Sequence, residues 1–214
     1  MSILNELSTN IQSGKAKIVK ELVAQAIDEK ISAKEILQDG LLAGMSIIGE
    51  KFKNNEVYVP EVLVAARAMN TGIAILKPLL QEDGVESVGK VIIGTVKGDQ
   101  HDIGKNIVKM MMEGKGLEVI DLGVDVSPEA FVQAAVENDA QIIACSALLT
   151  TTMGEIQAVV DAVDKAGIRD KVAVMIGGAP ITQDFCDSVN ADIYTADAAS
   201  AADEAVKAIK GMAS

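Results

Sequence analysis

The sequence predicts an α/β protein in which an N-terminal four-helix bundle precedes a five-stranded parallel sheet of the Rossmann-like, flavodoxin-like type. Apolar residues recur at helical spacing up to about residue 82, and beyond residue 88 short β-rich runs alternate with helical stretches. The acidic, glycine-containing segment 81–89 separates the two patterns and reads as a linker. We therefore expect a helical domain over residues 1–84 and an α/β domain over residues 88–214.

The first half should form four helices. The spacing of Ile18, Leu22 and Ala26 is typical of the apolar stripe of such a helix. Ser32 and Pro60 stand where helices are expected to begin. Pro78 should end or kink the fourth helix, because proline lacks the amide that continues a helix.

Five β-rich runs are predicted to be the strands of the second half. The commonest order of five such strands is 2-1-3-4-5, which opens a ligand crevice at the carboxyl ends of strands 1 and 3. His101 follows the first run, residues 146–152 follow the third, and Gly177–Gly178 follow the fourth, so all three segments should border this crevice. The runs are KVIIGTV (90–96), LEVIDL (117–122), QIIACSA (141–147), KVAVMIGG (171–178) and DIYTA (192–196).

Composition excludes several classes of function. Apolar residues make up 49% of the 214 residues, enough for a sizeable core, while the formal net charge of −12 argues against nucleic-acid or anionic-membrane partners. No apolar leader or membrane-spanning run is found, so we expect a cytoplasmic protein. Cys145 and Cys186 lie far apart without a CxxC pair, which predicts two buried thiols rather than a disulfide or a zinc site.

Common ligands of this crevice lack their binding residues. A phospho-receiver domain needs an aspartate at the end of strand 3 and a lysine after strand 5, where this chain has Cys145-Ser146 and Thr195. The loop after strand 1 has neither a Ser/Thr run for a flavin phosphate nor the GxGxxG of dinucleotide-binding proteins. A single imidazole on a loop remains.

The pattern Asp99-x-His101-x-x-Gly104 is typical of a metal ligand with its hydrogen-bond partner. A ligating histidine usually donates its other ring N–H to a carboxylate, and Asp99 is placed for that role. Gly104 would let a bulky ligand approach the backbone. One protein ligand cannot hold a bare ion, so the metal would have to arrive inside a macrocycle. The alternative is a polar loop histidine without such a task.

Three ordered motifs resemble the base-off, His-on cobalamin-binding proteins. They are DQHDIGKN (99–106), SALLTTTM (146–153) and GGAP (177–180). The resemblance implies that His101 replaces the dimethylbenzimidazole of cobalamin as the lower axial ligand of cobalt, with Asp99 as its hydrogen-bond partner.

The same resemblance assigns further corrinoid-binding residues. Ser146 and Leu148 would contact the buried base, and Gly177 and Gly178 would leave room for the nucleotide tail. Ser146 could instead bond to the backbone, and the glycines could form an ordinary turn. The remaining expected contacts come from Asp102, Gly104 and Thr150.

A catalytic relay Thr152–Asp99–His101 is also implied. The matching position is serine in methionine synthase, so the hydroxyl is retained here as threonine. Thr150 and Thr151 are competing candidates for this position.

The segment GEKFKNNEVYVPEVLVAARAM (49–69) resembles the helical cap of methionine synthase and of the corrinoid proteins of methanogens and acetogens. By that resemblance Phe52, Val59 and Val62 would cover the upper corrin face and shield a bound methyl group. The alternative for all three is plain packing inside the bundle.

Taken together, the resemblance implies a corrinoid carrier subunit that is not catalytic by itself. A substrate-specific methyltransferase would load a methyl group onto Co(I) of cobalamin or a related corrinoid, giving methyl-Co(III). An acceptor methyltransferase would then pass it to a pterin or thiol, and a reductive activase would restore Co(I). Methanol, methylamines, betaines and aryl methyl ethers are all compatible donors. The alternatives are an adenosylcobalamin-dependent mutase subunit and a B12-dependent regulatory module.

Overall fold

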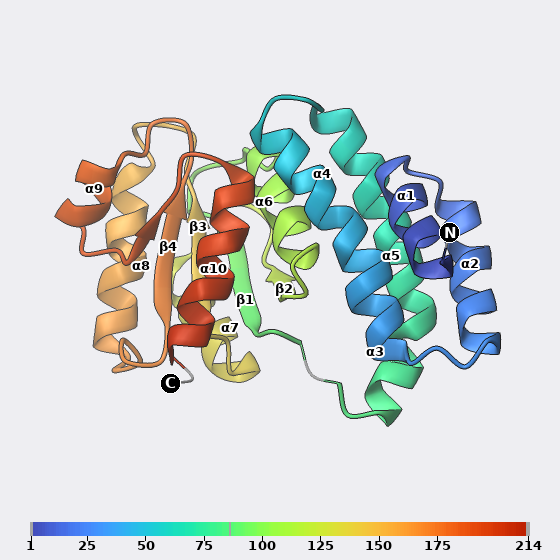
Figure 1. Ribbon diagram of the computed structural model, residues 1–214. Coiled ribbons are helices and arrows are strands. Elements are labelled where there is room, and N and C mark those ends of the chain that lie inside the picture. The colour runs from blue at the N-terminus through green and yellow to red at the C-terminus, as the bar shows by residue number, and fades with distance from the viewer. Residues whose placement is uncertain (1, 86, 213–214) are drawn as a thin grey trace. The chain divides into compact units, whose positions relative to one another are not determined.

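A computed structural model describes residues 2–85 and 87–212, and these divide into two compact units with the boundary between Ser87 and Val88 (Figure 1). The turn Gly114–Gly116 groups with the first unit. The first unit is helical and the second is an α/β unit with a five-stranded, all-parallel sheet. The predicted fold class is confirmed.

The helical unit contains four helical stretches within residues 2–85, as the apolar spacing predicts. The third stretch is continuous but changes from α-helix to π-helix and back. In order, the stretches are α1 (Ile3–Gln12), α2 (Ala16–Asp28), α3–η1–α4 (Ala33–Glu35, Ile36–Leu42 and Ala43–Lys53) and α5 (Val59–Glu82).

Two of the predicted helix signals are confirmed, and for Pro78 the alternative that it ends the helix is wrong while the kink stays a prediction. Ser32 caps the third stretch, since its hydroxyl accepts the Glu35 amide (3.2 Å) and its own amide donates to the Glu35 carboxylate (3.3 Å). Pro60 lies in the first turn of α5. Pro78 does not end α5, which continues to Glu82. A proline removes only one helical hydrogen bond, and the packing of α5 against α2 holds the helix through this defect.

Helix α5 is also the one helix of the described residues that is long and apolar enough to cross a membrane. It packs against α2 and α4, and its buried residues include Val62, Met69 and Leu76. The central helix of a bundle passes the same test of length and composition.

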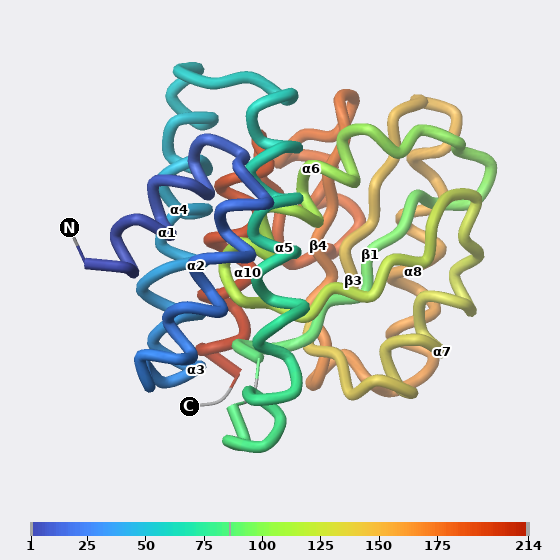
Figure 2. Tube along the Cα trace, turned by 90° about the vertical axis from the view of Figure 1, so that its right-hand side faces the viewer, coloured from blue at the N-terminus to red at the C-terminus, as the bar shows by residue number. Residues whose placement is uncertain are grey.

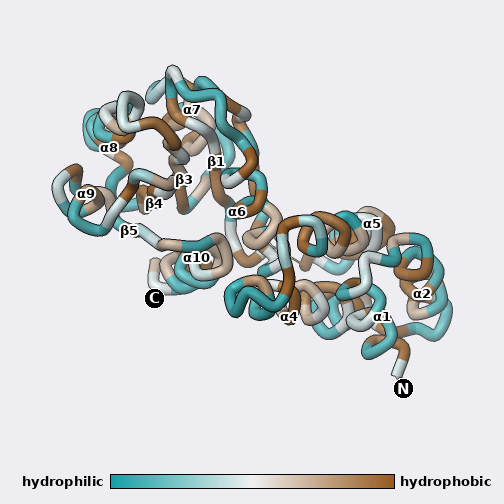
Figure 3. The backbone as a smooth tube through the Cα atoms, turned by 90° about the horizontal axis from the view of Figure 1, so that it is seen from above, coloured by the Kyte–Doolittle hydropathy of each residue, from teal (hydrophilic) through white to brown (hydrophobic). Residues whose placement is uncertain are grey.

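The sheet has the predicted strand order, β2-β1-β3-β4-β5, and every pairing is parallel. The β1, β3 and β4 strands are buried for most of their length, as expected for strands covered on both faces. Figure 3 shows β1 and β3 as largely hydrophobic stretches. The strands are β1 (Lys90–Thr95), β2 (Glu118–Asp121), β3 (Ile142–Ser146), β4 (Ala173–Gly177) and β5 (Ile193–Tyr194).

Helices cover both faces of this sheet. In Figures 1 and 2, α6 and α10 lie side by side on one face, and α7 and α8 pack together on the other. The core under α7 and α8 includes Ile92, Ile143, Phe131 and Val159. The helices are α6 (Ile103–Glu113), α7 (Pro128–Asn138), α8 (Met153–Lys165), α9 (Gln183–Ser188) and α10 (Ala198–Met212).

Candidate functional site

The candidate site lies where three parallel strands of the α/β unit end together. In the sheet register Thr95 of β1 is opposite Ser146 of β3, and Ser146 is opposite Gly177 of β4. Because the carboxyl ends of parallel strands share one edge, the loops that follow these residues are neighbours. The predicted meeting of the His101, Ser146 and Gly177 segments at one edge of the sheet is confirmed.

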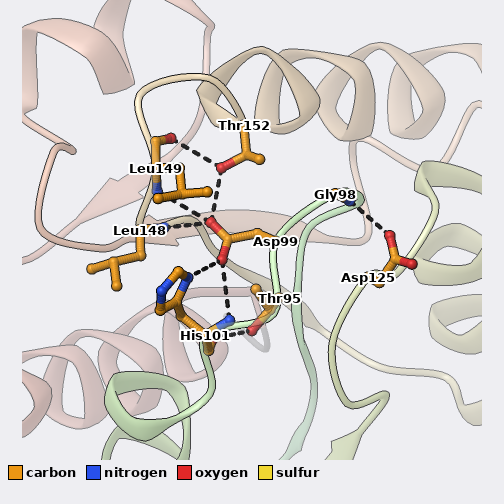
Figure 4. Close-up of polar contacts among 8 residues, drawn as sticks. All are labelled: Thr95, Gly98, Asp99, His101, Asp125, Leu148, Leu149 and Thr152. Carbon is orange, nitrogen blue, oxygen red and sulfur yellow. Dashed lines mark hydrogen bonds and ion pairs between the residues drawn. The ribbon is translucent and has the colours of Figure 1, made fainter.

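Asp99 is the centre of this arrangement (Figure 4). It is fully buried, and its two carboxylate oxygens accept five hydrogen bonds. One oxygen, Oδ1, accepts from His101 Nδ1 (2.6 Å) and from the His101 amide (3.1 Å). The other, Oδ2, accepts from the amides of Leu148 (2.8 Å) and Leu149 (3.2 Å) and from the Thr152 hydroxyl (2.8 Å). One carboxylate therefore joins the loop after β1 to the loop after β3.

These contacts keep Asp99 ionised. Burial by itself raises the pKa of Asp99, but hydrogen bonds from the His101 ring, the Leu148 amide, the Thr152 hydroxyl and the His101 amide outweigh it. The result is a pKa well below the ordinary value of 3.8. A carboxylate only accepts hydrogen bonds, so the ring proton lies on Nδ1 of His101 and Nε2 is the nitrogen that is left for a ligand.

The environment of His101 leaves this second nitrogen accessible. The His101 side chain is 49% exposed, and Nε2 makes no hydrogen bond within the described residues. Apolar side chains of neighbouring segments are also exposed, namely Leu148 and Leu149 in the loop after β3 and Ile103 at the start of α6. An imidazole with a fixed tautomer and an open nitrogen beside apolar surface suits a metal that is carried by a large apolar ring.

Of the three candidate threonines, the structure places Thr152 against Asp99. Thr152 is buried, whereas Thr150 and Thr151 are exposed and make no hydrogen bond to Asp99. The Thr152 hydroxyl also lies 2.9 Å from the Leu149 carbonyl oxygen, so its single proton is shared between two acceptors.

Asp99 does not act as a cap of α6 within the described residues. Its partners are the ring and amide of His101 and the loop after β3. The start of α6 is served by Asp102 instead, whose carbonyl accepts the Asn106 amide (2.8 Å) and whose carboxylate accepts the Asn106 side-chain amide (3.1 Å).

The glycines of the site separate into two kinds. Gly178 has φ +137°, and a Cβ there would lie 1.8 Å from the Ala147 carbonyl oxygen, so the backbone itself requires glycine. A Cβ on Gly104 or Gly177 would meet nothing within 4 Å. The protein's own packing does not explain these two glycines, and the space beside them is available to a ligand. Ser146 is half-buried, and its hydroxyl makes no hydrogen bond within the described residues, so the alternative of a backbone bond is not observed.

Sequence reasoning missed residues that hold the His101 loop. Thr95 is fully buried, and its hydroxyl donates to the His101 carbonyl oxygen (2.8 Å). Asp125 accepts the Gly98 amide (2.7 Å). Leu149 contributes the second amide to Asp99. Only Thr95 could have been found from the sequence, because it is the single hydroxyl residue of β1 and follows an apolar run.

The predicted cap residues lie on two helices of the helical unit. Phe52 is in the last turn of α4 and Val59 begins α5, and both are half-buried. Val62 is fully buried. Their place over a corrin ring stays a prediction.

Known protein families match both units of the chain. One B12 binding domain family matches residues 89–209, and a second B12 binding domain family matches residues 3–77. The chain belongs to the B12-binding corrinoid proteins. The cofactor is therefore cobalamin or a related corrinoid, as the motifs predict.

Relatives of this corrinoid protein match along most of its length. A corrinoid protein of Desulfitobacterium hafniense is 41% identical over 210 residues, which are 97% of this chain and 95% of that protein. The dimethylamine corrinoid protein of Methanosarcina barkeri is 42% identical over 93% of both chains. Trimethylamine corrinoid protein 1 of Methanosarcina acetivorans is 45% identical over 82% of this chain and 84% of its own.

Solved structures agree with these sequence matches. A chain of the methanol:cobalamin methyltransferase complex MtaBC from Methanosarcina barkeri superimposes with a TM-score of 0.88 at 29% identity, over 98% of this chain and 80% of that one. A cobalamin-binding protein from Desulfitobacterium hafniense gives a TM-score of 0.79 at 29% identity, over 97% and 98% of the two chains.

The side chains that could ligate a metal at this site suit the cobalt of a corrinoid. No three His, Cys, Asp or Glu side chains gather as a metal site in residues 2–85 and 87–212, and a corrin ring supplies its own equatorial nitrogens to cobalt. When its own base is displaced, a corrinoid would take one ligand from the protein, and the open Nε2 of His101 backed by Asp99 has the arrangement that ligating histidines use.

Proposed function

We propose that this corrinoid protein carries a methyl group from a substrate-specific methyltransferase to an acceptor methyltransferase that delivers it to a pterin or thiol. The observation that carries the proposal is the His101 ring, held through Nδ1 by a buried, ionised Asp99 while Nε2 is open. When bound, the corrinoid supplies the cobalt that accepts and releases the methyl group. The chain's own residues bind and orient this group.

His101 would be the lower axial ligand, and Asp99 would set its orientation. The bond to Nδ1 keeps that nitrogen protonated and directs Nε2 outward. Thr152 holds the second oxygen of Asp99. The relay Thr152–Asp99–His101 would thereby hold the ring proton at Nδ1 and leave Nε2 for the cobalt.

The groups around the ring would complete the pocket. Ser146 and Leu148 would contact the buried base, and the open space beside Gly104 and Gly177 would accommodate the corrinoid and its tail. On the helical unit, the partly exposed Phe52 suits a role over the upper face.

The other residues proposed to contact the corrinoid differ in their exposure. Val59 is partly exposed, like Phe52, whereas the full burial of Val62 favours bundle packing. Thr150 and Asp102 are exposed in the loops of the site and are open to the ligand.

The proposed partners are three proteins. A donor methyltransferase is supported by the match to the methanol:cobalamin methyltransferase complex, and the acceptor methyltransferase and reductive activase follow from the proposed carrier cycle. Relatives are named for trimethylamine and dimethylamine, so methylamines are the first donors to test, with methanol, betaines and aryl methyl ethers next. We place this cycle in the cytoplasm.

Electron paramagnetic resonance of the Co(II) form tests the central assignment. His101 is the only histidine of the chain, so uniform ¹⁵N-histidine labelling reports on this residue alone. We expect the axial nitrogen hyperfine splitting to change from the ¹⁴N to the ¹⁵N pattern on labelling. An unchanged splitting that comes from benzimidazole would contradict the proposal.

A further inference from the structure

The chain after β2 continues alongside the loop that carries His101. The Thr95 amide donates to the Gly123 carbonyl oxygen (3.0 Å), and the Val126 amide donates to the Thr95 carbonyl oxygen (3.0 Å). The Thr95 hydroxyl in turn donates to the His101 carbonyl oxygen (2.8 Å). The parallel pairing of β1 with β2 is therefore extended past the strand ends, up to the candidate site.

Asp125 completes this second support (Figure 4). Its carboxylate accepts the Gly98 amide (2.7 Å), and its own amide donates to the Asp99 carbonyl oxygen (3.0 Å). Both partners are backbone groups of the two residues that lie two and three positions before His101. Asp125 is exposed and has φ +56°, a conformation in which aspartate, asparagine and glycine are favoured.

The His101 loop is thus held from two sides by different chemistry. Leu148, Leu149 and Thr152 of the loop after β3 donate hydrogen bonds to the side chain of Asp99. Asp125 of the loop after β2 forms hydrogen bonds with the backbone of Gly98 and Asp99. Removal of the first support would expose a buried carboxylate, whereas removal of the second would leave the Asp99 side-chain bonds in place and free only the backbone.

We infer that Asp125 is a positioning residue that holds the Gly98–Asp99 backbone and thereby presents the His101 imidazole to the corrinoid. The inference rests on the proposed function, in which His101 is the axial ligand. Asp125 acts only through the chain that precedes His101. A protein loop that is ordered before binding loses less conformational entropy on binding. The hydrogen bonds of Asp125 should therefore raise the affinity of the protein for a corrinoid that is ligated by His101.

Three variants separate the carboxylate from the backbone conformation. Asp125→Gly keeps the left-handed conformation and removes the acceptor oxygen. Asp125→Asn keeps both, since its amide oxygen can accept the Gly98 N–H. Asp139→Gly is the matched control, because Asp139 is exposed, has φ +50° and lies at the opposite end of α7. Thermal unfolding of all three verifies that they fold.

Amide hydrogen exchange of the protein without corrinoid tests the support directly. We expect the Gly98 amide to exchange about tenfold faster in Asp125→Gly, since a charge-assisted hydrogen bond contributes at least the energy of one decade in an equilibrium. The increase should be smaller in Asp125→Asn, whose neutral amide oxygen accepts a weaker bond, and exchange should be unchanged in Asp139→Gly. Unchanged Gly98 protection in Asp125→Gly would overturn the inference.

Two measurements test whether Asp125 affects corrinoid binding. They are cobalamin titration and electron paramagnetic resonance of the Co(II) form with ¹⁵N-histidine. We expect cobalamin to bind about tenfold more weakly to Asp125→Gly, with a smaller imidazole-ligated fraction, and Asp125→Asn to recover part of both. A defect in Asp125→Asn as large as in Asp125→Gly overturns the inference, as does an Asp125→Gly variant that behaves like the wild type. A wild-type spectrum with benzimidazole on cobalt instead overturns the proposed function, so the two failures are distinct.

Discussion

At the scale of single residues, Asp99 links the chemistry of the site to the stability of the fold. A carboxylate without exposure to water is stable only because each oxygen is saturated with donors. Those donors come from residues that lie two positions and about fifty positions away along the chain. The residue that orients His101 therefore also joins two loops of the sheet.

Replacement of Asp99 by asparagine should make this double role measurable. The new amide nitrogen cannot accept the hydrogen bonds that one oxygen receives, and we expect the free energy of unfolding to fall by about 3 kcal/mol at neutral pH. The pKa of Asp99 is lowered in the folded state, so its contribution is fully present above the ordinary value of 3.8 and is lost as pH falls toward the folded pKa. The difference between wild type and Asp99→Asn should therefore shrink below about pH 4.

Urea unfolding from pH 7 down to pH 3 measures this difference. Asp102→Asn is the control for loss of one negative charge at an exposed neighbour. A difference between wild type and Asp99→Asn that stays constant over this range would show that Asp99 contributes no ionised hydrogen bonds to stability.

The two consecutive glycines at the end of β4 are expected to respond differently to substitution by alanine. Gly178→Ala forces a methyl group against the Ala147 carbonyl oxygen at a φ of +137°, and we expect a loss of about 3 kcal/mol in unfolding free energy. Gly177→Ala meets no atom within 4 Å, and its stability should change by less than about 1 kcal/mol.

Cobalamin titration of the Gly177→Ala protein then tests whether the open space beside Gly177 is occupied by the corrinoid. If the corrinoid tail passes Gly177, Gly177→Ala weakens binding without loss of stability. Equal affinity of Gly177→Ala and wild type would place the tail elsewhere.

At the scale of elements, a buried ion pair ties α6 to β2. Lys105 of α6 is almost fully buried, and its Nζ lies 2.6 Å from Oδ1 of Asp121 at the end of β2. Burial opposes ionisation of Asp121, but the hydrogen bonds from Lys105 and the Gly123 amide and the charges of Lys105 and Lys109 keep its pKa below the ordinary value. The helix that begins two residues after His101 is thereby fixed to the sheet.

Removal of Asp121 should lower the free energy of unfolding more than removal of Lys105. Asp121→Ala leaves a buried ammonium group with only the Asn106 side-chain oxygen as a partner, and should lower the unfolding free energy by about 3 kcal/mol or more. Lys105→Met leaves Asp121 with Lys109 and the Gly123 amide, and should cost about 1 to 2 kcal/mol. Urea unfolding of both single variants and the double variant measures the coupling, and equal single-variant costs would contradict this asymmetry.

At the scale of the whole molecule, the α/β unit holds the only cluster of described residues to which we assign cofactor chemistry. The Asp99–His101 pair can orient a ligand, and we assign none of the described residues to the binding of a methyl donor such as an amine. The relatives are named as corrinoid proteins, and the similar solved chain comes from a complex with a methyltransferase.

The isolated protein should therefore transfer methyl groups slowly. With free methylamines as donors, we expect multiple turnover at least about 100-fold slower than with a donor methyltransferase, since positioned acid–base groups alone contribute roughly 10²- to 10⁴-fold. Absorbance of the bound corrinoid follows the reaction, and the His101→Ala protein serves as the control. Rapid multiple turnover by the isolated chain would contradict the carrier function.

The amino-acid sequence by itself determined the two-part organisation, the parallel strand order and the pairing of His101 with Asp99. Local spacing decides these features, because apolar periodicity selects helix or strand and a separation of two residues keeps a carboxylate near its histidine. The sequence could also place the loops after β1, β3 and β4 together, since parallel strands bring their carboxyl ends to one edge.

Only the tertiary structure decided which distant groups complete the site. The choice of Thr152 over Thr150 and Thr151 depends on the path of a loop 53 residues away from Asp99. The contact of Asp125 with Gly98 spans 27 residues and involves a backbone amide that carries no side-chain signal. Neighbouring hydroxyls and backbone amides are chemically alike in a sequence, and the fold distinguishes them by the direction in which each one points.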